Sequence, residues 1–314
     1  MPGSTRRRWD SRSAARRGRR KCRSQPPTDV PEGDTIHRAA LTLHRALAGQ
    51  RVVRFESVLP ALTRVHDDSP LTGQTVEAVG ARGKHLLMRF SGGQTLRTHM
   101  RMKGSWHIYR PGERWQRPRR DMRIVVATNE FEAVGFNIPV AEFIESARVE
   151  KHEELRRLGP DLLGEQFDRA EAIRRLTARA DTAVGDALLD QRVVAGIGNV
   201  YKSELLFACE VNPLATVCDL TAEQVACLID TALKFLRTNV SGRLAPMTTY
   251  GGYRRTTRRD HPSERLWVYG RARLPCRRCG TAIQVRKQGS DARLTYWCPQ
   301  CQPAKPWAGG AHSG

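Results

Sequence analysis

Four cysteines near the C-terminus of this 314-residue chain have the spacing of a metal site. Cys276 and Cys279 form one C-x-x-C pair, and eighteen residues separate it from a second pair, Cys298 and Cys301. Each pair places two thiolates on one tight turn, and two such turns complete the tetrahedron that Zn²⁺ prefers. Because four thiolates leave no open position, we predict one structural Zn²⁺ that stabilises a hairpin too small to fold alone.

The charge of the chain favours nucleic acid as the partner of this predicted zinc ribbon, although a protein partner is the alternative. The ribbon segment carries the basic residues Arg271, Arg273, Arg277, Arg278, Arg286, Lys287 and Arg293. The whole chain has 53 Lys and Arg against 32 Asp and Glu, a formal net charge of +21. Such a balance is typical of proteins that bind a polyanion, either nucleic acid or an anionic membrane surface.

Two further short motifs could contact phosphate groups. The first is the run from Gly196 to Lys202, in which glycines allow a tight turn and the following helix start presents free N–H groups. Asn199 adds a side-chain donor. The second is Arg82-Gly83-Lys84-His85 beside an apolar strand, which could direct an ammonium group into a groove. Taken alone, the first motif is more often a simple turn and the second is more often a solvated surface lysine.

Hydrophobic periodicity predicts the elements that must position these residues. Apolar residues recur at helical spacing after Pro31, which suits the first turn of a helix; they are Ile36, Ala39, Ala40, Leu43 and Leu47. Short β-rich runs then predict a sandwich or barrel, at 51–59, 75–79, 85–90, 95–99, 106–109 and 123–128. Beyond Lys151 the patterns are helical, at 152–158, 169–180, 183–189, 203–209 and 222–238.

Composition divides the chain into segments. Residues 1–30 form a basic extension that we expect to be disordered, because residues 1–29 hold ten Lys and Arg and almost nothing apolar. Without residues 1–29 the net charge is still +13. We expect a β-sandwich domain at 31–150, a helical domain at 151–265 that ends in a polar loop, the zinc module at 266–302 and a disordered tail at 303–314.

No apolar run is long enough for a transmembrane helix or a secretory signal, so we expect no membrane partner. The predicted location is the cytoplasm, in association with the nucleoid, where cysteines stay reduced. Cys209, Cys218 and Cys227 fall in helical patterns, and we therefore expect them to be small buried hydrophobic residues.

Taken together, the motifs resemble one family. Pro31-Glu32-Gly33-Asp34, Arg82-Gly83-Lys84, His99 with Met102, the run 196–202, the Val-Tyr-Gly-Arg run 268–271 and the cysteine ribbon occur in an order and at distances similar to those of the formamidopyrimidine-DNA glycosylase/endonuclease VIII family. The opening Pro-Glu-Gly resembles the endonuclease VIII branch. The resemblance covers residues 31–302. It implies an α+β fold with an N-terminal β-sandwich and leading helix, a central helix–two-turn–helix domain and a C-terminal zinc-ribbon hairpin.

The resemblance also implies an activity: a bifunctional DNA glycosylase and AP lyase of base excision repair, which removes oxidised bases, here pyrimidines, from damaged DNA. Pro31 matches the N-terminal proline that attacks C1′ of the nucleotide. Glu32 matches the acid beside it that shuttles protons, and Lys84 matches a lysine that contacts phosphate near the lesion. We expect the protein to act as a monomer.

DNA-contacting positions are implied in the same way. Asn199 and Arg293 match the phosphate clamps of the helical domain and the zinc hairpin, and His99 and Tyr269 match further backbone contacts. Met102, with its neighbours Arg101 and Lys103, matches the wedge that enters the gap left by a flipped base.

The implied chemistry agrees with the properties of a terminal proline. A terminal amine has a pKa near 8 in model peptides, and a helix N-terminus lowers it further. Attack on C1′ therefore has an unprotonated nitrogen available, and the resulting iminium ion makes the C2′ proton acidic, so that the 3′ and then the 5′ phosphate can be eliminated. Pro31-Glu32 by itself would be a plain helix start.

One departure from the family pattern concerns the position of the proline. A proline within a peptide bond is a tertiary amide and cannot act as a nucleophile, yet the proline here is residue 31. In the explanation that we favour, the numbered start is too early and Val30 is the initiator. The alternative is a real extension on a protein that binds damaged DNA without catalysis or that requires processing. An RNA-associated zinc ribbon would explain the charge and the cysteines but not the Pro-Glu start.

Overall fold

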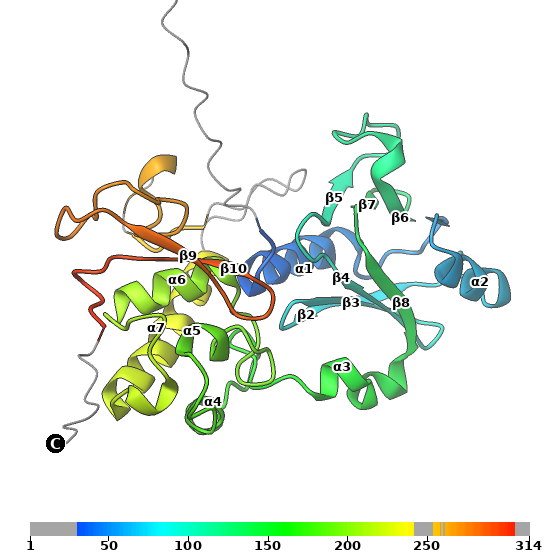
Figure 1. The fold of residues 1–314 in the computed structure, drawn as a ribbon. Coiled ribbons are helices and arrows are strands. Elements are labelled where there is room, and N and C mark those ends of the chain that lie inside the picture. Colours follow the sequence, from blue (N-terminus) through cyan, green and yellow to red (C-terminus); the bar gives the residue numbers. More distant parts are fainter. Residues whose placement is uncertain (1–29, 242–253, 258, 260, 305–314) are drawn as a thin grey trace, which may run out of the picture.

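A computed structural model describes residues 30–241, 254–257, 259 and 261–304 of the chain. The basic extension, most of the C-terminal tail and much of the predicted polar loop lie outside these residues. A β-rich domain and a helical domain lie side by side, with the zinc module on the helical domain (Figure 1). None of the described helices is long and apolar enough to cross a membrane.

Helix α1 (Gly33–Leu47) begins where the sequence predicts it. Glu32 is its N-cap, and the Glu32 amide donates to Thr35 Oγ1 over 2.7 Å while that hydroxyl donates to the Glu32 carbonyl. The apolar face, including Ile36 and Leu43, is almost fully buried. This cap fixes Pro31 and Glu32 at the first turn of the helix.

Two antiparallel four-stranded sheets make up the β-sandwich. One has the order β1 (Arg54–Ser57), β6 (Met122–Ala127), β7 (Glu132–Phe136) and β5 (Ser105–Tyr109). The other has the order β2 (Val76–Arg82), β3 (His85–Phe90), β4 (Gln94–His99) and β8 (Val140–Glu145). Side chains of both sheets and of α1 share one core, so the helix start is held rigidly against the sandwich.

The structure contains elements that the sequence patterns did not predict. Helix α2 (Pro60–Asp68) buries only Leu62 fully, so its apolar periodicity is weak. Strand β7 is a short, almost continuously buried run, and β8 is half-buried without clear alternation. Alternation of apolar and polar residues indicates a strand with one buried and one solvent-exposed face, and neither strand has that environment.

The helical domain contains α3 (Glu153–Arg156), α4 (Arg169–Thr177), α5 (Val184–Ala187), α6 (Asn199–Ala208) and α7 (Ala222–Ser241). Short 3₁₀ turns lie at Arg119–Asp121, Ser146–Lys151, Val217–Asp219 and Pro262–Glu264. Helix α6 begins at Asn199, four residues earlier than predicted, so the glycine run leads directly into its first turn. The core of this domain is formed by α4, α5, α6 and α7 and by the segments that connect them.

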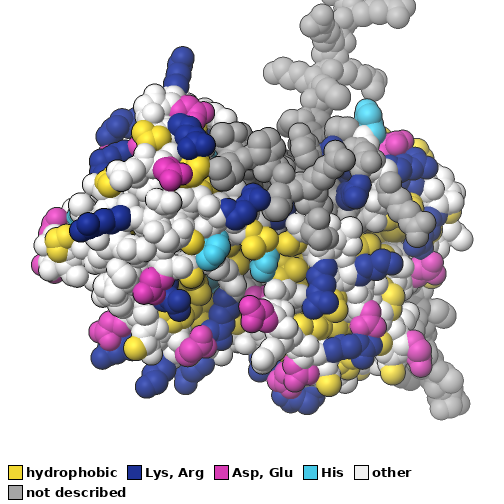
Figure 2. Space-filling view, turned by 180° about the vertical axis from the view of Figure 1, so that it is seen from behind, with side chains coloured by type: hydrophobic (Ala, Val, Ile, Leu, Met, Phe, Trp, Pro, Cys, Tyr) yellow, Lys and Arg dark blue, Asp and Glu magenta, His cyan; other side chains and the backbone are white. Residues whose placement is uncertain are grey.

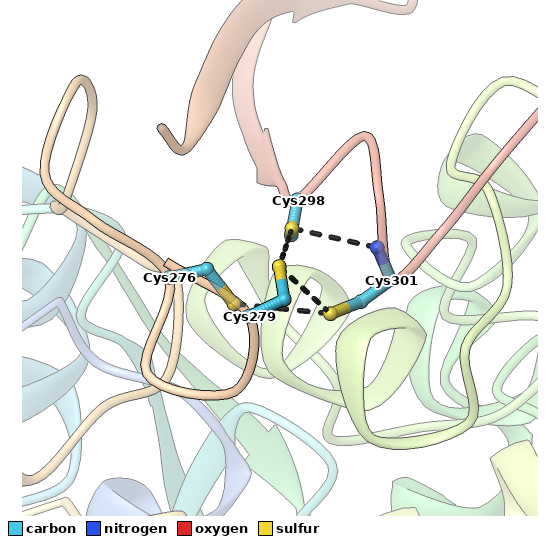
Figure 3. A group of neighbouring side chains, drawn as sticks. All are labelled: Cys276, Cys279, Cys298 and Cys301. Atoms are coloured by element: carbon cyan, nitrogen blue, oxygen red, sulfur yellow. Dashed lines mark hydrogen bonds between the residues drawn. The ribbon is translucent and has the colours of Figure 1, made fainter. Parts of the chain in front are cut away.

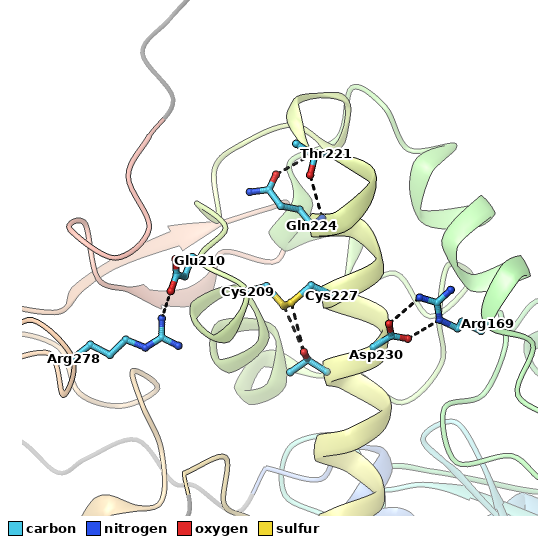
Figure 4. The surroundings of a disulfide bond; sticks show 9 residues. Arg169, Cys209, Glu210, Thr221, Gln224, Cys227, Asp230 and Arg278 are labelled. Carbon is cyan, nitrogen blue, oxygen red and sulfur yellow. Dashed lines mark hydrogen bonds and ion pairs between the residues drawn. A yellow bond between two sulfur atoms is a disulfide. The ribbon is translucent and has the colours of Figure 1, made fainter.

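The expectation for three cysteines is wrong. Cys209, just after α6, and Cys227 on α7 form a disulfide, with their Cα atoms 6.0 Å apart, and both are half-buried (Figure 4). Cys218 is exposed. Helical patterns included Cys209 and Cys227, but they could not show that the two residues lie close together in the fold.

The zinc module is a hairpin of β9 (Gln284–Gln288) and β10 (Arg293–Trp297) with the two cysteine turns beside it. It packs on α6 through a small core that includes Val200, Phe207 and Tyr296. The hairpin is therefore attached to the helix that follows the glycine run.

We expect Leu43→Ala to lower the free energy of unfolding by about 2–5 kcal/mol, because the side chain is only 1% exposed and its removal leaves a cavity between α1 and the sandwich. Leu41→Ala on the same helix is the matched control, since Leu41 is 38% exposed and its loss should cost less than about 0.5 kcal/mol. Urea unfolding followed by circular dichroism measures both. Equal losses would contradict this account of the core.

Candidate functional site

The centre of the candidate site is the Glu32 carboxylate at the N-terminus of α6. It accepts hydrogen bonds from the amides of Val200 (2.7 Å), Gly198 (3.2 Å) and Tyr201 (3.2 Å). Glu32 is 1% exposed, so these amides replace water around its charge. Free N–H groups and the helix dipole favour an anion at this end of a helix. The first residues of the β-sandwich domain are thereby attached to the helical domain.

Two glycines make this approach possible. The Gly33 amide donates to the Gly196 carbonyl over 2.9 Å, and Gly196 has a φ of +109°, which strongly favours glycine. A Cβ on Gly198 would lie 2.3 Å from Cδ of Glu32. The glycines of the 196–202 run are therefore explained by the close contact with α1.

Asp34 and Arg254 form a buried ion pair beside Glu32. Arg254 Nη2 lies 2.7 Å from Asp34 Oδ1, and the side chains are 1% and 0% exposed. The same Nη2 donates to the Val30 carbonyl over 3.3 Å, and the guanidinium lies 4.8 Å from the Tyr201 ring centroid. Burial opposes ionisation of Asp34, but the charge and hydrogen bonds of Arg254 outweigh it and hold the pKa of Asp34 below its usual value.

Lys84 lies in the turn between β2 and β3, and a hydrogen bond to the helical domain holds this turn. The Gly83 amide donates to Asp161 Oδ2 over 2.6 Å, and Gly83 has a φ of +58°. Desolvation lowers the pKa of Lys84 to about 8; the charge of Glu32 opposes this shift, and Arg293 and Arg254 add to it. The ammonium group of Lys84 is therefore coupled electrostatically to Glu32, Arg254 and Arg293.

The zinc hairpin borders the candidate site through a contact with Asn199 and through the side chain of Arg293. Asn199 Nδ2 donates to the Leu294 carbonyl over 2.8 Å, so its side chain connects α6 to β10. Arg293 is half-buried, and its Nη1 lies 3.4 Å from Sδ of Met102 on the β4–β5 turn. The residues predicted as a phosphate clamp and as a wedge therefore meet across the two domains.

Tyr269 precedes the cysteine turns and is almost fully buried. Its ring centroid lies 5.0 Å from that of Tyr296 on β10. Desolvation, followed by the negative charge of Glu32, raises the pKa of Tyr269 to about 12. Its hydroxyl therefore remains a hydrogen-bond donor at neutral pH.

His99 ends β4 next to the predicted wedge. Its Nδ1 accepts a hydrogen bond from the Arg101 amide over 3.0 Å, and Arg101 has a φ of +49°. Desolvation, with the charges of Arg101 and Lys84, lowers the pKa of His99 to about 4, so the ring is neutral at pH 7. Arg101, Met102 and Lys103 are exposed on this turn, and no described residue forms an ion pair with Lys103.

The four predicted zinc ligands point toward one another (Figure 3). Their sulfur atoms all lie within 4.8 Å of one another, and the Cys276–Cys301 and Cys279–Cys301 separations are 3.9 and 3.5 Å. A Zn–S bond of about 2.3 Å in a tetrahedron requires sulfurs roughly 3.8 Å apart. The donor set and its geometry therefore fit one structural Zn²⁺.

Sequence comparison places these features in a known family. The formamidopyrimidine-DNA glycosylase N-terminal domain matches residues 30–139, its H2TH domain matches residues 158–248, and the zinc finger found in FPG and IleRS matches residues 273–304. The chain belongs to the formamidopyrimidine-DNA glycosylase family. The predicted helix–two-turn–helix domain and zinc module are confirmed, as is the α+β fold.

Several relatives within this family are similar over almost their whole length. A probable endonuclease 8 2 of Streptomyces coelicolor is 43% identical over 288 residues, which cover 91% of this chain and 98% of the relative. The DNA-(apurinic or apyrimidinic site) lyase Nei2 of Mycolicibacterium smegmatis is 38% identical over 276 residues, 88% of this chain and 100% of the relative. These names agree with the predicted endonuclease VIII branch.

Solved structures of the family share the fold. Lactococcus lactis Fpg bound to DNA with an oxidised pyrimidine superposes with a TM-score of 0.74, at 23% identity over 87% of this chain and 100% of that one. The same protein bound to DNA with an abasic site gives a TM-score of 0.73 at 23% identity, with the same coverage.

Sequence reasoning missed further buried polar residues around the family's motifs. Glu204 accepts hydrogen bonds from the amides of residues 267, 268 and 269 at 2.8–2.9 Å and so anchors the segment that carries Tyr269. Lys202 is fully buried, and its Nζ donates to Thr295 Oγ1 over 2.6 Å. Desolvation lowers its pKa to about 8. In the sequence, Lys202 ends the predicted 196–202 run and Glu204 falls within the predicted helical pattern 203–209, but neither pattern indicated that these charged side chains are buried.

We expect one zinc ion per chain, and we expect its removal by a chelator to disorder the hairpin. Cys279→Ser should lower the zinc content and shift the fluorescence of the buried Trp297, which directly precedes Cys298. The exposed Cys218, outside the cluster, supplies the control Cys218→Ser. Metal analysis and fluorescence measure both, and full zinc content in the Cys279→Ser protein would overturn the assignment.

Proposed function

We propose that this chain is a bifunctional DNA glycosylase and AP lyase of base excision repair, with the imino nitrogen of Pro31 as nucleophile. The observation that carries the proposal is the position of Pro31, buried at the start of α1, with the Glu32 carboxylate fixed next to it by three amides of the α6 N-terminus. The relatives named as endonuclease 8 and as an AP lyase support the same activity.

The reaction follows from a free nitrogen at Pro31. Its lone pair forms a bond to C1′ of the damaged nucleotide, and the glycosidic bond breaks with its electrons leaving on the base. Glu32 transfers protons between the nitrogen and the sugar ring oxygen. Loss of a C2′ proton from the iminium ion expels the 3′ phosphate, and a second elimination expels the 5′ phosphate. Water then releases the sugar fragment and regenerates Pro31.

The remaining predicted residues would hold damaged DNA around this nitrogen. Lys84, Asn199 and Arg293 supply charge and donors to phosphates, and His99 and Tyr269 supply neutral donors. Met102, flanked by Arg101 and Lys103, would fill the space left by the flipped nucleotide. Figure 2 shows Lys and Arg side chains on both halves of one face of the molecule, and this distribution suits a polyanionic partner. All these residues come from one chain, so we propose that a monomer is active, in the cytoplasm beside the nucleoid.

We propose oxidised pyrimidines as the preferred bases. The Pro31–Asp34 start, typical of the endonuclease VIII branch, and the relatives named endonuclease 8 support this substrate class.

The active polypeptide, in this proposal, begins at Pro31. The N-terminal family domain matches from residue 30 onward. A peptide bond from Val30 would turn the nitrogen into an amide without a nucleophilic lone pair. The alternative, a damaged-DNA-binding zinc protein without catalysis, applies if that bond persists.

Borohydride reduction tests the proposed intermediate. A chain that begins at Pro31 should form a covalent adduct with a duplex that contains an oxidised pyrimidine, because the iminium ion is reduced to a stable amine. A chain that retains residues 1–30, or one whose terminal nitrogen is acetylated, should give no adduct, as seen by denaturing gel electrophoresis. Strong salt-sensitive binding with no adduct from the chain that begins at Pro31 would favour the non-catalytic alternative.

From the lowered pKa of Lys84 we predict that DNA binding depends on pH. Its pKa of about 8 means that the ammonium charge is present below pH 8 and is lost above it, so its contribution to phosphate binding should fall as pH rises through 8. Affinity for a duplex with a non-cleavable abasic analogue, measured from pH 6.5 to 9.5, should therefore fall more in the parent than in Lys84→Met.

Lys151→Met, at an exposed lysine outside the candidate site, is the control and should follow the parent. Parallel curves for the parent and for Lys84→Met would count against the phosphate contact.

A further inference from the structure

Arg254 is a buried cation that contacts the residue before the proposed nucleophile, and no family motif in the sequence accounts for it. It lies C-terminal to α7, in a segment without helical or strand periodicity. Its side chain is nevertheless 1% exposed and enters the gap between α1 and α6. Burial of a guanidinium is costly unless its charge is compensated and its donors are satisfied. The contacts that provide this compensation indicate what the side chain does.

Within the described part of the chain, this guanidinium contacts the start of α1 and the ring of Tyr201 on α6. Nη2 lies 2.7 Å from Asp34 Oδ1, and Nε lies 3.3 Å from Asp34 Oδ2, so both carboxylate oxygens are engaged. The face of the group lies 4.8 Å from the Tyr201 ring centroid. Asp34 is two residues after Glu32, so this geometry fixes the first turn of α1 from the side opposite the sandwich.

The contact with residue 30 places the positive charge beside the reacting nitrogen. Nη2 donates to the Val30 carbonyl oxygen over 3.3 Å, and the carbon of that carbonyl is bonded to the nitrogen of Pro31. When the chain begins at Pro31, this carbonyl is absent and the nitrogen is a terminal amine. The guanidinium is then within one peptide unit of the amine, and the two cannot both be charged without repulsion.

We propose that Arg254 is a positioning residue for the Pro31 nucleophile: through Asp34 it fixes the helix start, and through its own charge it keeps the imino nitrogen unprotonated. This proposal rests on the proposed function. Asp34 and Arg254 carry opposite charges. Replacement of Arg254 by a neutral residue therefore makes the electrostatic potential at the Pro31 nitrogen more negative, whereas replacement of Asp34 makes it more positive. A side chain that only filled space would not have this property.

Other ionisable groups surround this pair and set the electrostatic background. Arg38 on α1 lies 3.7 Å from Asp34 Oδ2, and further coupled groups are Glu32, Lys84, Tyr201, Lys202, Tyr269 and Arg293. Since the variants below leave all these groups unchanged, the change in pH dependence between variants reports on the Asp34–Arg254 pair.

The test uses the chain from Pro31 to Gly314 and a duplex with a preformed abasic site. Arg254→Gln should lower the single-turnover nicking rate on the order of 10- to 100-fold, because misplacement of a reacting atom is costly. The affinity for a duplex with a non-cleavable abasic analogue should change less than about two-fold, because the side chain is only 1% exposed. The rising limb of the rate–pH profile should move to higher pH, since a lost cation raises the pKa of the amine.

Two further variants test the direction in which the pH profile shifts when a charge is removed. Asp34→Asn should also slow nicking, but its rising limb should move to lower pH because a negative charge is lost. Arg254→Lys retains the charge and should leave the limb in place while recovering part of the rate. If Arg254→Gln does not fold, as judged by thermal unfolding, these two variants carry the test.

A matched control is available at the surface. Arg169 and Asp230 form a bidentate pair at 2.6 and 2.8 Å with both side chains about half exposed (Figure 4). Arg169→Gln should change neither rate nor pH profile. A fall in rate matched by an equal loss of affinity, or pH profiles that do not move in opposite directions, would overturn the role of Arg254. If the unaltered chain forms no borohydride-trapped adduct, the proposed function itself fails.

Discussion

The rest of the structure depends on the burial of the Glu32 carboxylate at the start of α6. A carboxylate without water is tolerated only where donors replace that water, and the amides of Gly198, Val200 and Tyr201 do so. Those amides are free because they belong to the first turn of a helix. One side chain therefore connects the beginning of the β-sandwich domain to the middle of the helical domain, and the glycine run between α5 and α6 exists to let it approach.

A second carboxylate repeats this arrangement one turn further along α6. Glu204 accepts the amides of residues 267–269 and so anchors the segment that enters the zinc module. Helix α6 thus receives α1 at its N-terminus and holds the zinc hairpin along its side. The Zn²⁺ closes the hairpin itself, while Asn199 and Lys202 connect β10 to the helix. The position of Arg293 relative to Pro31 is consequently determined by α6 and not by either outer module alone.

The sequence predicts those parts of this arrangement that depend on residues close together in the chain. The cysteine pairs have a spacing that only a tight metal site explains, and α1 and α7 have clear helical periodicity. The site residues came from a resemblance because no single motif specifies them. What could not be read depends on long-range contact. Cys209 follows α6 and Cys227 lies on α7, and the sequence does not encode locally how these two helices are oriented. Strand β7 is buried on both faces and so lacks alternation. Arg254 lies in a polar segment with no periodicity at all.

Arg254 and Glu32 show how one buried cluster can combine stability with reactivity. A lone buried charge at either position would destabilise the fold, whereas the cluster compensates each charge with a partner: Glu32 with amides, Asp34 with Arg254. The partners are supplied by different segments, so the cluster is complete only when α1, α6 and residue 254 are all in place. Its field at the proline nitrogen therefore exists only in the folded protein. In an unfolded chain the same amine would be solvated and would have its ordinary pKa near 8. Folding itself thus prepares the nucleophile, because the contacts that bury the start of α1 also place the Arg254 guanidinium within one peptide unit of its first atom.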